Sequence, residues 1–234
     1  MKSTSLVFDW DLTLSPVDMI HCILDGVMSP KEYWALLDQS PVKTRELVTH
    51  VGFTETNQSG MFGRIHNKTS IAEAGKNIPL YPGALEFMNK VKGVIPVHII
   101  TVGTIDFIVN HPLVHLVDSL QGCSYLDEAM TIIKELITPA DKVRCIENVV
   151  GPDYGGVIYV GDGYSDYWAM KAVLSHGGKA VAVYHDESSY KRTLDLDAQL
   201  DGKLSLICEA DYSEGSPFDI FVNECLIDAD ELVR

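Results

Sequence analysis

Short, nearly continuous apolar runs recur along the chain and are rich in valine and isoleucine. Such runs are typical of strands that are buried on both faces of a sheet. Because proline cannot donate a backbone hydrogen bond, Pro96 places the start of the second run near Val97. The predicted strands cover residues 5–8, 97–101, 157–160 and 179–184, with a weaker fifth strand at 204–208.

Between these runs, apolar residues recur at the spacing of a helix. Leu85, Met88 and Val91 follow one another at intervals of three, which predicts a helix over 83–92. Thr138 followed by Pro139 is a helix start signal, and it predicts a helix over 139–150. A third helix is expected over 166–174. Alternating strands and helices predict an α/β fold: a Rossmann-like parallel sheet with helices on both faces.

Residues 16–79 do not follow this alternation. Their pattern predicts a set of short helices with a loop between them: 18–28, 31–38, 41–51 and 70–75, with the loop at 53–67. We therefore expect residues 1–15 and 80–234 to form the α/β core. Residues 16–79 are expected to form a small helical domain inserted after the first strand.

The charge of the chain restricts its partners. The 234 residues include 18 Lys and Arg against 33 Asp and Glu, which gives a formal net charge of −15. Nucleic acids and anionic membranes are bound by clustered cations, and no basic run is present, so neither is expected as a partner. A small anion held in a local pocket is compatible with this charge, because net charge sets only the far field.

The cysteines and the amino-terminal segment suggest a compartment. Five cysteines, an odd number without a CxxC pair, favour reduced thiols and a cytoplasmic protein. The apolar run at the start is too short for a signal peptide, and no stretch reaches the length of a membrane helix.

Polar side chains stand at the end of each predicted strand. In open α/β sheets, ligands bind beyond the carboxyl ends of the strands, so these side chains are expected to converge on one edge. Lys142, near the start of the 139–150 helix, is expected at the same edge, with Lys134 as a rival. The strand-end residues are Asp9 and Asp11, then Thr101, Val102 and Gly103, then Asp162 and Asp166.

This set of residues fits the chemistry of a phosphate ester. Crowded carboxylates repel one another unless a cation joins them, and hard oxygen ligands favour Mg²⁺. A carboxylate can also act as a nucleophile toward phosphorus. Thr101 can donate a hydrogen bond to a phosphoryl oxygen, Gly103 allows close approach of the backbone, and Lys142 supplies a fixed positive charge.

Four motifs together resemble those of the haloacid dehalogenase-like hydrolase superfamily. LVFDWDLTLS resembles its DxDx[TV] motif, HIITVGT its hydroxyl-bearing motif, DKVRCIENVV its lysine motif and VIYVGDGYSD its GDGxxD motif. The four occur in family order. The flanking segments LYPGALEFM and TVGTIDFI are similar to the phosphoserine-phosphatase-like branch. Trp10 and Leu12 depart from the residues that are common there.

The resemblance implies a role for each residue. Asp9 matches the nucleophile, and Asp11 matches the general acid and base that protonates the leaving alcohol. Thr101 and Lys142 match the phosphate-binding pair, to which we add the loop residues Val102 and Gly103. The metal site, expected to hold Mg²⁺, would draw on Asp9, Asp11, Asp162 and Asp166, the last of which supports either the metal or Lys142.

The activity expected from this resemblance is hydrolysis of a small-molecule phosphomonoester through an aspartyl-phosphate. Two alternatives use the same residues: a phosphotransferase or mutase that passes the phosphoryl group to another hydroxyl, and an idle homologue that only binds a ligand. The insert resembles the family's helical cap, and its candidates for substrate contact are Lys43, Arg45, Glu55 and Arg64. Substrate and oligomeric state stay open at this level.

Overall fold

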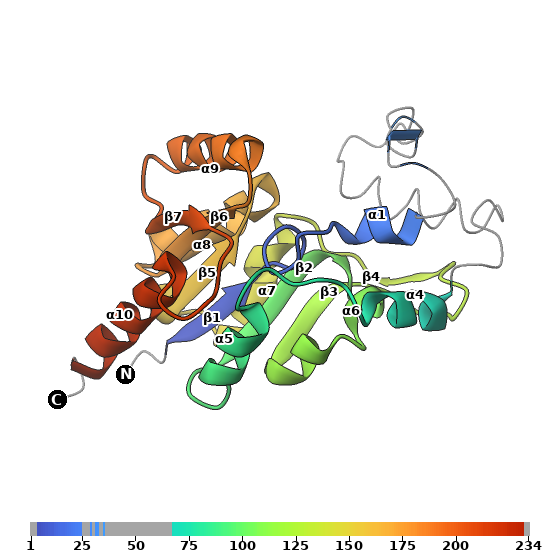
Figure 1. Ribbon diagram of the computed structural model, residues 1–234, viewed down its shortest axis with the longest axis horizontal. Coiled ribbons are helices and arrows are strands. Elements are labelled where there is room, and N and C mark those ends of the chain that lie inside the picture. The colour runs from blue at the N-terminus through green and yellow to red at the C-terminus, as the bar shows by residue number, and fades with distance from the viewer. Residues whose placement is uncertain (1–3, 25–28, 30, 33–34, 36–66, 232–234) are drawn as a thin grey trace.

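The computed structural model describes residues 4–24, 29, 31–32, 35 and 67–231 (Figure 1). Within these residues the chain forms one seven-stranded sheet in the order β4-β3-β2-β1-β5-β6-β7. The strands are β1 (Ser5–Phe8), β2 (Val97–Thr104), β3 (Ser119–Tyr125), β4 (Ile133–Glu135), β5 (Val157–Gly161), β6 (Lys179–Tyr184) and β7 (Leu206–Glu209).

Strand β1 lies at the centre of the sheet, where the strand order reverses. It pairs in parallel with β2 on one side and with β5 on the other, and the chain then adds strands outward in both directions. Only β4, at an edge of the described sheet, is antiparallel to its neighbour. This reversal is the position at which open α/β sheets bind ligands, beyond the carboxyl ends of the strands.

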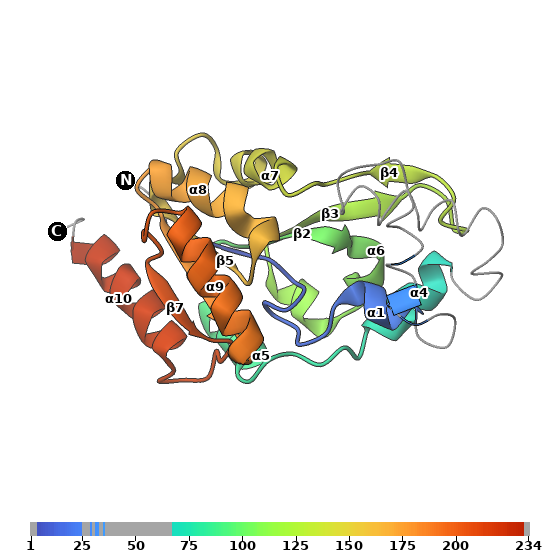
Figure 2. The same ribbon diagram turned by 90° about the horizontal axis from the view of Figure 1, so that it is seen from above.

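Helices cover both faces of the sheet. Alternate residues of β1 point to opposite faces, so that Leu6 and Phe8 belong to one buried cluster and Val7 to the other. The first cluster is completed by α5 (Ala84–Val91) and α10 (Pro217–Glu231). The second is completed by α7 (Asp141–Val150), α8 (Tyr167–Ser175) and α9 (Glu187–Gln199). Figure 2 shows α7 and α8 on one side of the strands and α5 on the other. The predicted α/β class with helices on both faces is confirmed.

The structure adds elements that the hydrophobic pattern did not predict. These are β3, β4, α9 and α10, together with the short helix α6 (Ile105–Ile108) and the 3-10 helices η1 (Pro112–Leu116), η2 (Tyr154–Gly156) and η3 (Tyr164–Asp166). The sequence of β3, SLQGCSY, is half polar and carries a glycine, so it lacks the apolar run of a central strand. Helix α9 buries Ser189 and Thr193 beside Leu196, a polar stripe that apolar spacing does not detect.

Two predicted boundaries shift. Strand β2 continues three residues beyond Thr101 to Thr104, and its register with β3 shifts between Ile100 and Thr104. Helix α7 begins at Asp141 rather than at Pro139. The Thr138 amide donates to the Asp141 carboxylate at 3.0 Å, and the Asp141 amide donates to the Thr138 hydroxyl oxygen at 3.4 Å, which is the reciprocal bonding that marks a helix start.

The two ends of the insert pack onto the core. They form α1 (Met19–Leu24) and α4 (Lys68–Gly75), which contact each other and contribute Met19, Ile23 and Ile71 to the same buried cluster as β1. The helices expected at 31–38 and 41–51 and the loop at 53–67 lie wholly or mostly outside the described residues. The division into a core and a domain of residues 16–79 stays a prediction.

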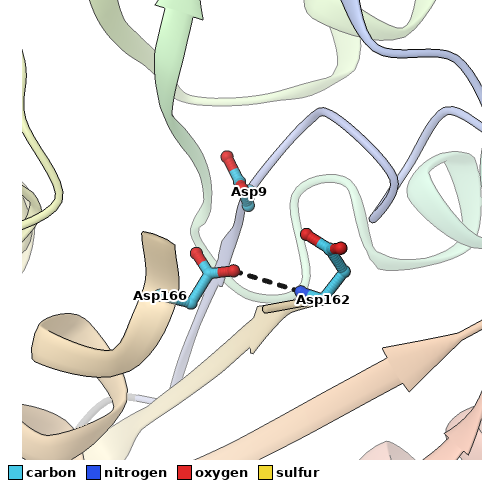
Figure 3. Close-up of side chains that lie close together, drawn as sticks. All are labelled: Asp9, Asp162 and Asp166. Carbon is cyan, nitrogen blue, oxygen red and sulfur yellow. Dashed lines mark hydrogen bonds between the residues drawn. The ribbon is translucent and has the colours of Figure 1, made fainter. Parts of the chain in front are cut away.

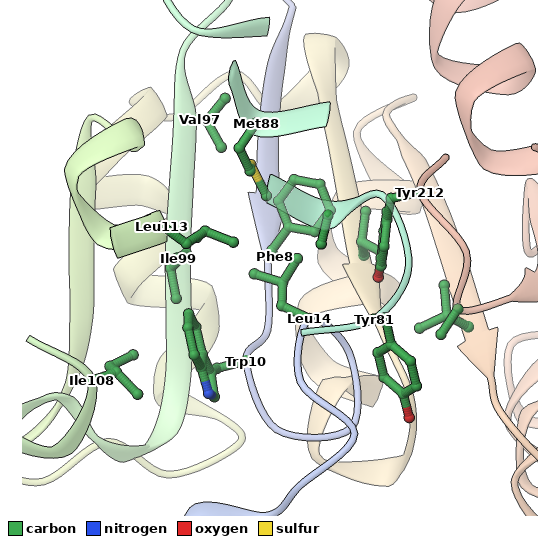
Figure 4. Close-up of a cluster of buried hydrophobic side chains, with 14 of the residues drawn as sticks. Phe8, Trp10, Leu14, Tyr81, Met88, Val97, Ile99, Ile108, Leu113 and Tyr212 are labelled. Carbon is green, nitrogen blue, oxygen red and sulfur yellow. The ribbon is translucent and has the colours of Figure 1, made fainter. Parts of the chain in front are cut away.

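The carboxyl-terminal segment holds the loop that follows β1. Tyr212 and Phe218 surround Phe8 with ring centroids 6.1 and 5.9 Å away, inside the apolar cluster of Figure 4. The Tyr212 hydroxyl donates a 2.7 Å hydrogen bond to the backbone carbonyl of Thr13, and both residues are almost fully buried. This contact anchors the loop after β1, which carries Asp9 and Asp11.

Replacing Tyr212 by Phe tests this connection. The variant leaves the buried Thr13 carbonyl without its hydrogen-bond donor, so we expect the free energy of unfolding to fall by about 1–3 kcal/mol. Urea denaturation followed by circular dichroism measures the change. Tyr190→Phe is the matched control, because Tyr190 is exposed and should shift the midpoint by little. Equal midpoints for the two variants would contradict a structural role for the Tyr212 hydroxyl.

Candidate active site

Asp9 stands directly after β1, and its backbone amide continues the pairing with β5 by donating to Val160 at 2.9 Å. The residue is 2% exposed. Its Oδ2 lies 3.1 Å from the Nζ of Lys142, a fully buried ammonium on the first turn of α7. Its Oδ1 has no hydrogen-bond partner among the described residues. One oxygen of Asp9 is therefore held, and the other is available to a ligand.

Asp166 holds both Lys142 and the loop that carries Asp162. Its Oδ1 accepts hydrogen bonds from Lys142 Nζ and from the Tyr159 hydroxyl, each at 2.7 Å. Its Oδ2 accepts from the backbone amides of Asp162 and Gly163 at 3.1 and 3.3 Å. With four donors on two oxygens, the buried Asp166 carboxylate orients Lys142 and shapes the loop that carries Asp162.

The carboxylates of Asp9, Asp162 and Asp166 form a buried cluster (Figure 3). One oxygen from each lies within 4.8 Å of the others. Asp162 also faces Arg192 of α9, whose Nη2 lies 3.4 Å from its Oδ2. Carboxylate oxygens at this spacing are the donor set of a hard cation.

Asp11 approaches the same site from the loop after β1. Its Oδ1 accepts a 2.9 Å hydrogen bond from the backbone amide of Met19, at the start of α1. Its Oδ2 lies so close to Gly103 that a Cβ on that glycine would come within 2.9 Å of it. The glycine predicted for close approach is therefore needed for the position of Asp11.

Leu12, the next residue, is one of the two departures noted in the sequence. It adopts φ +56°, a left-handed conformation that costs a non-glycine residue roughly 1–2 kcal/mol. A glycine at this position would avoid that cost. Trp10, the other departure, is fully buried in the core, where its ring packs edge-on against His111.

The carboxyl end of β2, which includes Thr101, Val102 and Gly103, lies beside these carboxylates. The backbone amide of Gly103 donates a 2.9 Å hydrogen bond to the Thr101 hydroxyl oxygen. Thr101 is fully buried, and this bond occupies its acceptor side while leaving its O–H as a donor. The carbonyl of Val102 accepts from the Cys123 thiol of β3 at 3.2 Å.

Burial sets the electrostatics of the site. It raises the pKa of Asp9 to about 6, an effect that the neighbouring Lys142 opposes. The pKa of Asp11 lies well above its usual value because of burial and the charges of Asp18 and Asp9. Burial and Asp166 raise the pKa of Asp162 in the same way. Burial lowers the pKa of Lys142, but the attraction of Asp166 and Asp9 outweighs it, so the net shift is upward and the ammonium stays charged.

A cavity of about 270 Å³ opens above these groups. Five of the predicted site residues line it: Asp9, Asp11, Val102, Gly103 and Asp162. Thr101, Lys142 and Asp166 are fully buried and do not line it; the last two lie directly behind Asp9. The rival Lys134 is exposed on β4. The remaining described lining residues are Leu12, Asp18, Met19, Ile20, Ile23, Thr104, Tyr125, Gly163, Tyr164, Ser165 and Arg192.

Sequence reasoning missed three residues that the structure places at the site: Arg192, Tyr159 and Asp18. Arg192 lies on a helix that was not predicted. Tyr159 is indistinguishable from its neighbours in an apolar strand. Asp18 had a usable signal, since it is the first residue of the helix predicted over 18–28; in the structure it precedes α1, and its Oδ1 accepts from the Ile20 amide. The candidates Lys43, Arg45, Glu55 and Arg64 lie outside the described residues.

In the described part of the chain, no helix is both long and apolar enough to cross a membrane. None of the five cysteines forms a disulfide in the part of the chain that the structure describes.

Several solved structures share this fold at low sequence identity. A substrate-bound phosphoserine phosphatase is 15% identical, covers 95% of this chain and 99% of its own, and has a TM-score of 0.62. A haloacid dehalogenase-like hydrolase from Streptococcus pneumoniae is 15% identical at 95% and 98% coverage with a TM-score of 0.54. A HAD family hydrolase from Salmonella enterica serovar Typhi is 16% identical with a TM-score of 0.61; the match covers 80% of this chain and spans 64% of the Salmonella chain.

A search of curated proteins found no match. A family model for haloacid dehalogenase-like hydrolases matches residues 6–171, which is more than half of the chain. This chain, with its strand-end aspartates and buried lysine, therefore belongs to the haloacid dehalogenase-like hydrolase family.

Proposed function

We propose that this protein is a Mg²⁺-dependent phosphatase that hydrolyses a small-molecule phosphomonoester through an aspartyl-phosphate on Asp9. One observation carries the proposal. Asp9 is a buried carboxylate at the floor of a cavity, with one oxygen held by Lys142 and the other without a partner. Such an oxygen is positioned and desolvated for attack on a substrate in the cavity.

In the first step, a carboxylate oxygen of Asp9 attacks the phosphorus of the ester. A new bond forms between this oxygen and phosphorus, and the bond between phosphorus and the leaving oxygen breaks. Asp11 lines the same cavity, and burial together with the charges of Asp18 and Asp9 raises the pKa of its carboxyl group, which favours the protonated form that a general acid needs. That proton passes to the leaving oxygen, so that the product departs as a neutral alcohol.

In the second step, Asp11 acts as a base. Its carboxylate takes a proton from a water molecule, whose oxygen then attacks phosphorus and displaces Asp9. Inorganic phosphate is released, and both carboxylates return to their starting states. The hydrogen bond from the Met19 amide to Asp11 and the space left by Gly103 hold Asp11 in place for both transfers.

The phosphoryl group would be bound at the carboxyl end of β2, with Lys142 behind Asp9. The Thr101 hydroxyl retains a free donor, and Val102 and Gly103 line the cavity beside Asp9 and Asp11. Lys142 offsets the negative charge that gathers around Asp9. Asp166 positions Lys142 and the Asp162 loop rather than touching the substrate.

The acidic cluster fits a divalent cation. Asp9 and Asp162 would hold Mg²⁺, with Asp11 beside them, while the oxygens of Asp166 are already bonded to four donors. When bound, Mg²⁺ neutralises charge on the transferred phosphoryl group and helps orient it. The likeness of this fold to a phosphoserine phosphatase supports phosphate-ester chemistry, and the retained Asp11 supports turnover over passive binding.

The first test replaces the nucleophile. Asp9→Asn keeps the size of the side chain but removes the attacking carboxylate, so we expect phosphate release from an aryl phosphate to fall by at least about 10³-fold. Asp201→Asn is the matched control, because Asp201 is exposed on a distant turn. Circular dichroism verifies that both variants fold. Full activity in a folded Asp9→Asn variant would refute the covalent mechanism.

The second test concerns Asp11 and the leaving group. An alkoxide needs a proton as it departs, whereas a nitrophenolate does not. Asp11→Asn should therefore slow hydrolysis of an alkyl phosphate by about 10²–10⁴-fold, and its first step with p-nitrophenyl phosphate far less. Stopped-flow detection of the nitrophenol burst separates this step from the second. An equal loss for both leaving groups would contradict the role of Asp11 as a general acid.

The third test links Mg²⁺ binding to pH. In the metal-free folded protein, the pKa of Asp9 is raised to about 6, whereas in the unfolded chain it is near 4. This contribution therefore lowers stability as pH rises from about 4 to 6. Mg²⁺ competes with the proton on Asp9, so we expect Mg²⁺ to raise the Tm more at pH 7.5 than at pH 5. The apparent affinity for Mg²⁺ should be at least about tenfold tighter at pH 7.5.

Thermal unfolding over a MgCl₂ titration measures this effect without requiring turnover. EDTA should reverse it, and Asp162→Asn should remove it, while Asp201→Asn should retain it. A Mg²⁺ effect that is the same at both pH values would contradict binding by these carboxylates.

A further inference from the structure

Arg192 is the one basic side chain among the described residues that line the cavity. The other charged lining residues are four carboxylates, those of Asp9, Asp11, Asp18 and Asp162. Arg192 projects from α9, whose residues Thr193 and Leu196 are fully buried against the sheet. The helix that carries Arg192 is therefore anchored in the core.

The guanidinium of Arg192 is only partly used. Among the described residues, the guanidinium makes one side-chain contact, a 3.4 Å approach of Nη2 to Oδ2 of Asp162. A guanidinium carries five N–H donors in a planar fork. The side chain is 38% exposed, against 12% for Asp162, and it lines the cavity, so it can donate further hydrogen bonds to a ligand there. A structural ion pair at an interior site would use more of these donors.

The place of Arg192 in the cavity matters as much as its charge. Asp162 belongs to the cluster with Asp9, so Arg192 is one carboxylate removed from the oxygen that attacks phosphorus. A group bound at Arg192 would therefore lie in the same cavity as a phosphoryl group at Asp9. The apolar side chains of Leu12 and Met19 line this cavity as well.

We propose that Arg192 binds a carboxylate at the far end of the substrate, and that the substrates are short phosphomonoesters ending in a carboxylate. This inference rests on the proposed phosphatase function. The fork geometry of a guanidinium matches a carboxylate with two parallel hydrogen bonds. A second phosphate would bring more negative charge into a cavity that already holds four carboxylates, whereas a carboxylate brings one charge that Arg192 matches.

The competing role for Arg192 is to neutralise Asp162. The two roles predict different patterns of binding. If Arg192 acts only through Asp162, its removal weakens every phosphate-like ligand equally. If it binds the far carboxylate, its removal weakens only ligands that carry one.

The test measures binding of matched ligands to the Mg²⁺-loaded protein by isothermal titration calorimetry. One series is made of phosphonates that end in a carboxylate two to five carbons away, and the other of alkylphosphonates of equal length. Phosphonates are not hydrolysed, so the readout does not depend on turnover. The variants are Arg192→Gln and the control Arg144→Gln, since Arg144 lies on α7 with ion-pair contacts no closer than 3.9 Å.

We expect the wild-type protein to bind the carboxylate ligand of at least one chain length about tenfold or more tightly than its alkyl counterpart. Arg192→Gln should reduce this preference to less than about twofold while leaving alkylphosphonate binding within about threefold, and Arg144→Gln should retain it. Absence of the preference in the wild type, or an equal loss for both series in Arg192→Gln, would overturn the inference alone. Failure of every phosphonate to bind would refute the proposed function and this inference with it.

Discussion

A single buried ammonium connects the parts of the candidate site. Lys142 is fully buried and lies 3.1 Å from Asp9 and 2.7 Å from Asp166, so one charge joins the end of β1, the start of α7 and the loop before α8. Removing one partner of a buried ion pair typically costs about 3–5 kcal/mol, because the remaining charge is left without compensation. The positions of Asp9, Asp162 and the loop amides that bind Asp166 therefore depend on this lysine being charged and in place.

The parallel sheet brings the groups of the site together. Strands β1, β2 and β5 are adjacent and parallel, and parallel strands end at the same edge of a sheet. Asp9 follows β1, Thr101 to Thr104 form the end of β2, and Asp162 follows β5. Segments separated by more than ninety residues along the chain thereby supply one cavity. The register is held by side chains that alternate between two apolar clusters, so a shift of one residue would turn Asp9 and its neighbours to the wrong face.

The parts of the fold that could be predicted from sequence are those with a simple pattern. The central strands and helices α5, α7 and α8 are fully buried on one or both sides, and their apolar spacing is strong. Strand β3 and helix α9 were not predicted because buried serines, threonines and a glycine replace apolar residues in them. The acidic residues of the site follow strands that were predicted, so their convergence was foreseeable, whereas the placement of Arg192 and Tyr159 depends on tertiary packing that no local pattern encodes.

The cations beside the buried carboxylates explain how a chain with a net charge of −15 can be suited to an anionic ligand. Burial makes the carboxylates of Asp9 and Asp162 costly to ionise, and their pKa values rise in consequence. That cost is lowered by Lys142 on the buried side and would be lowered by a divalent cation on the open side. Lys142 lies against both Asp9 and Asp166, and a cation held by Asp9 and Asp162 would supply further positive charge for a phosphoryl group. The many surface carboxylates lie in solvent, where their charge is screened within about 8–10 Å, so the local field is set by these few buried groups and by Arg192 at the rim.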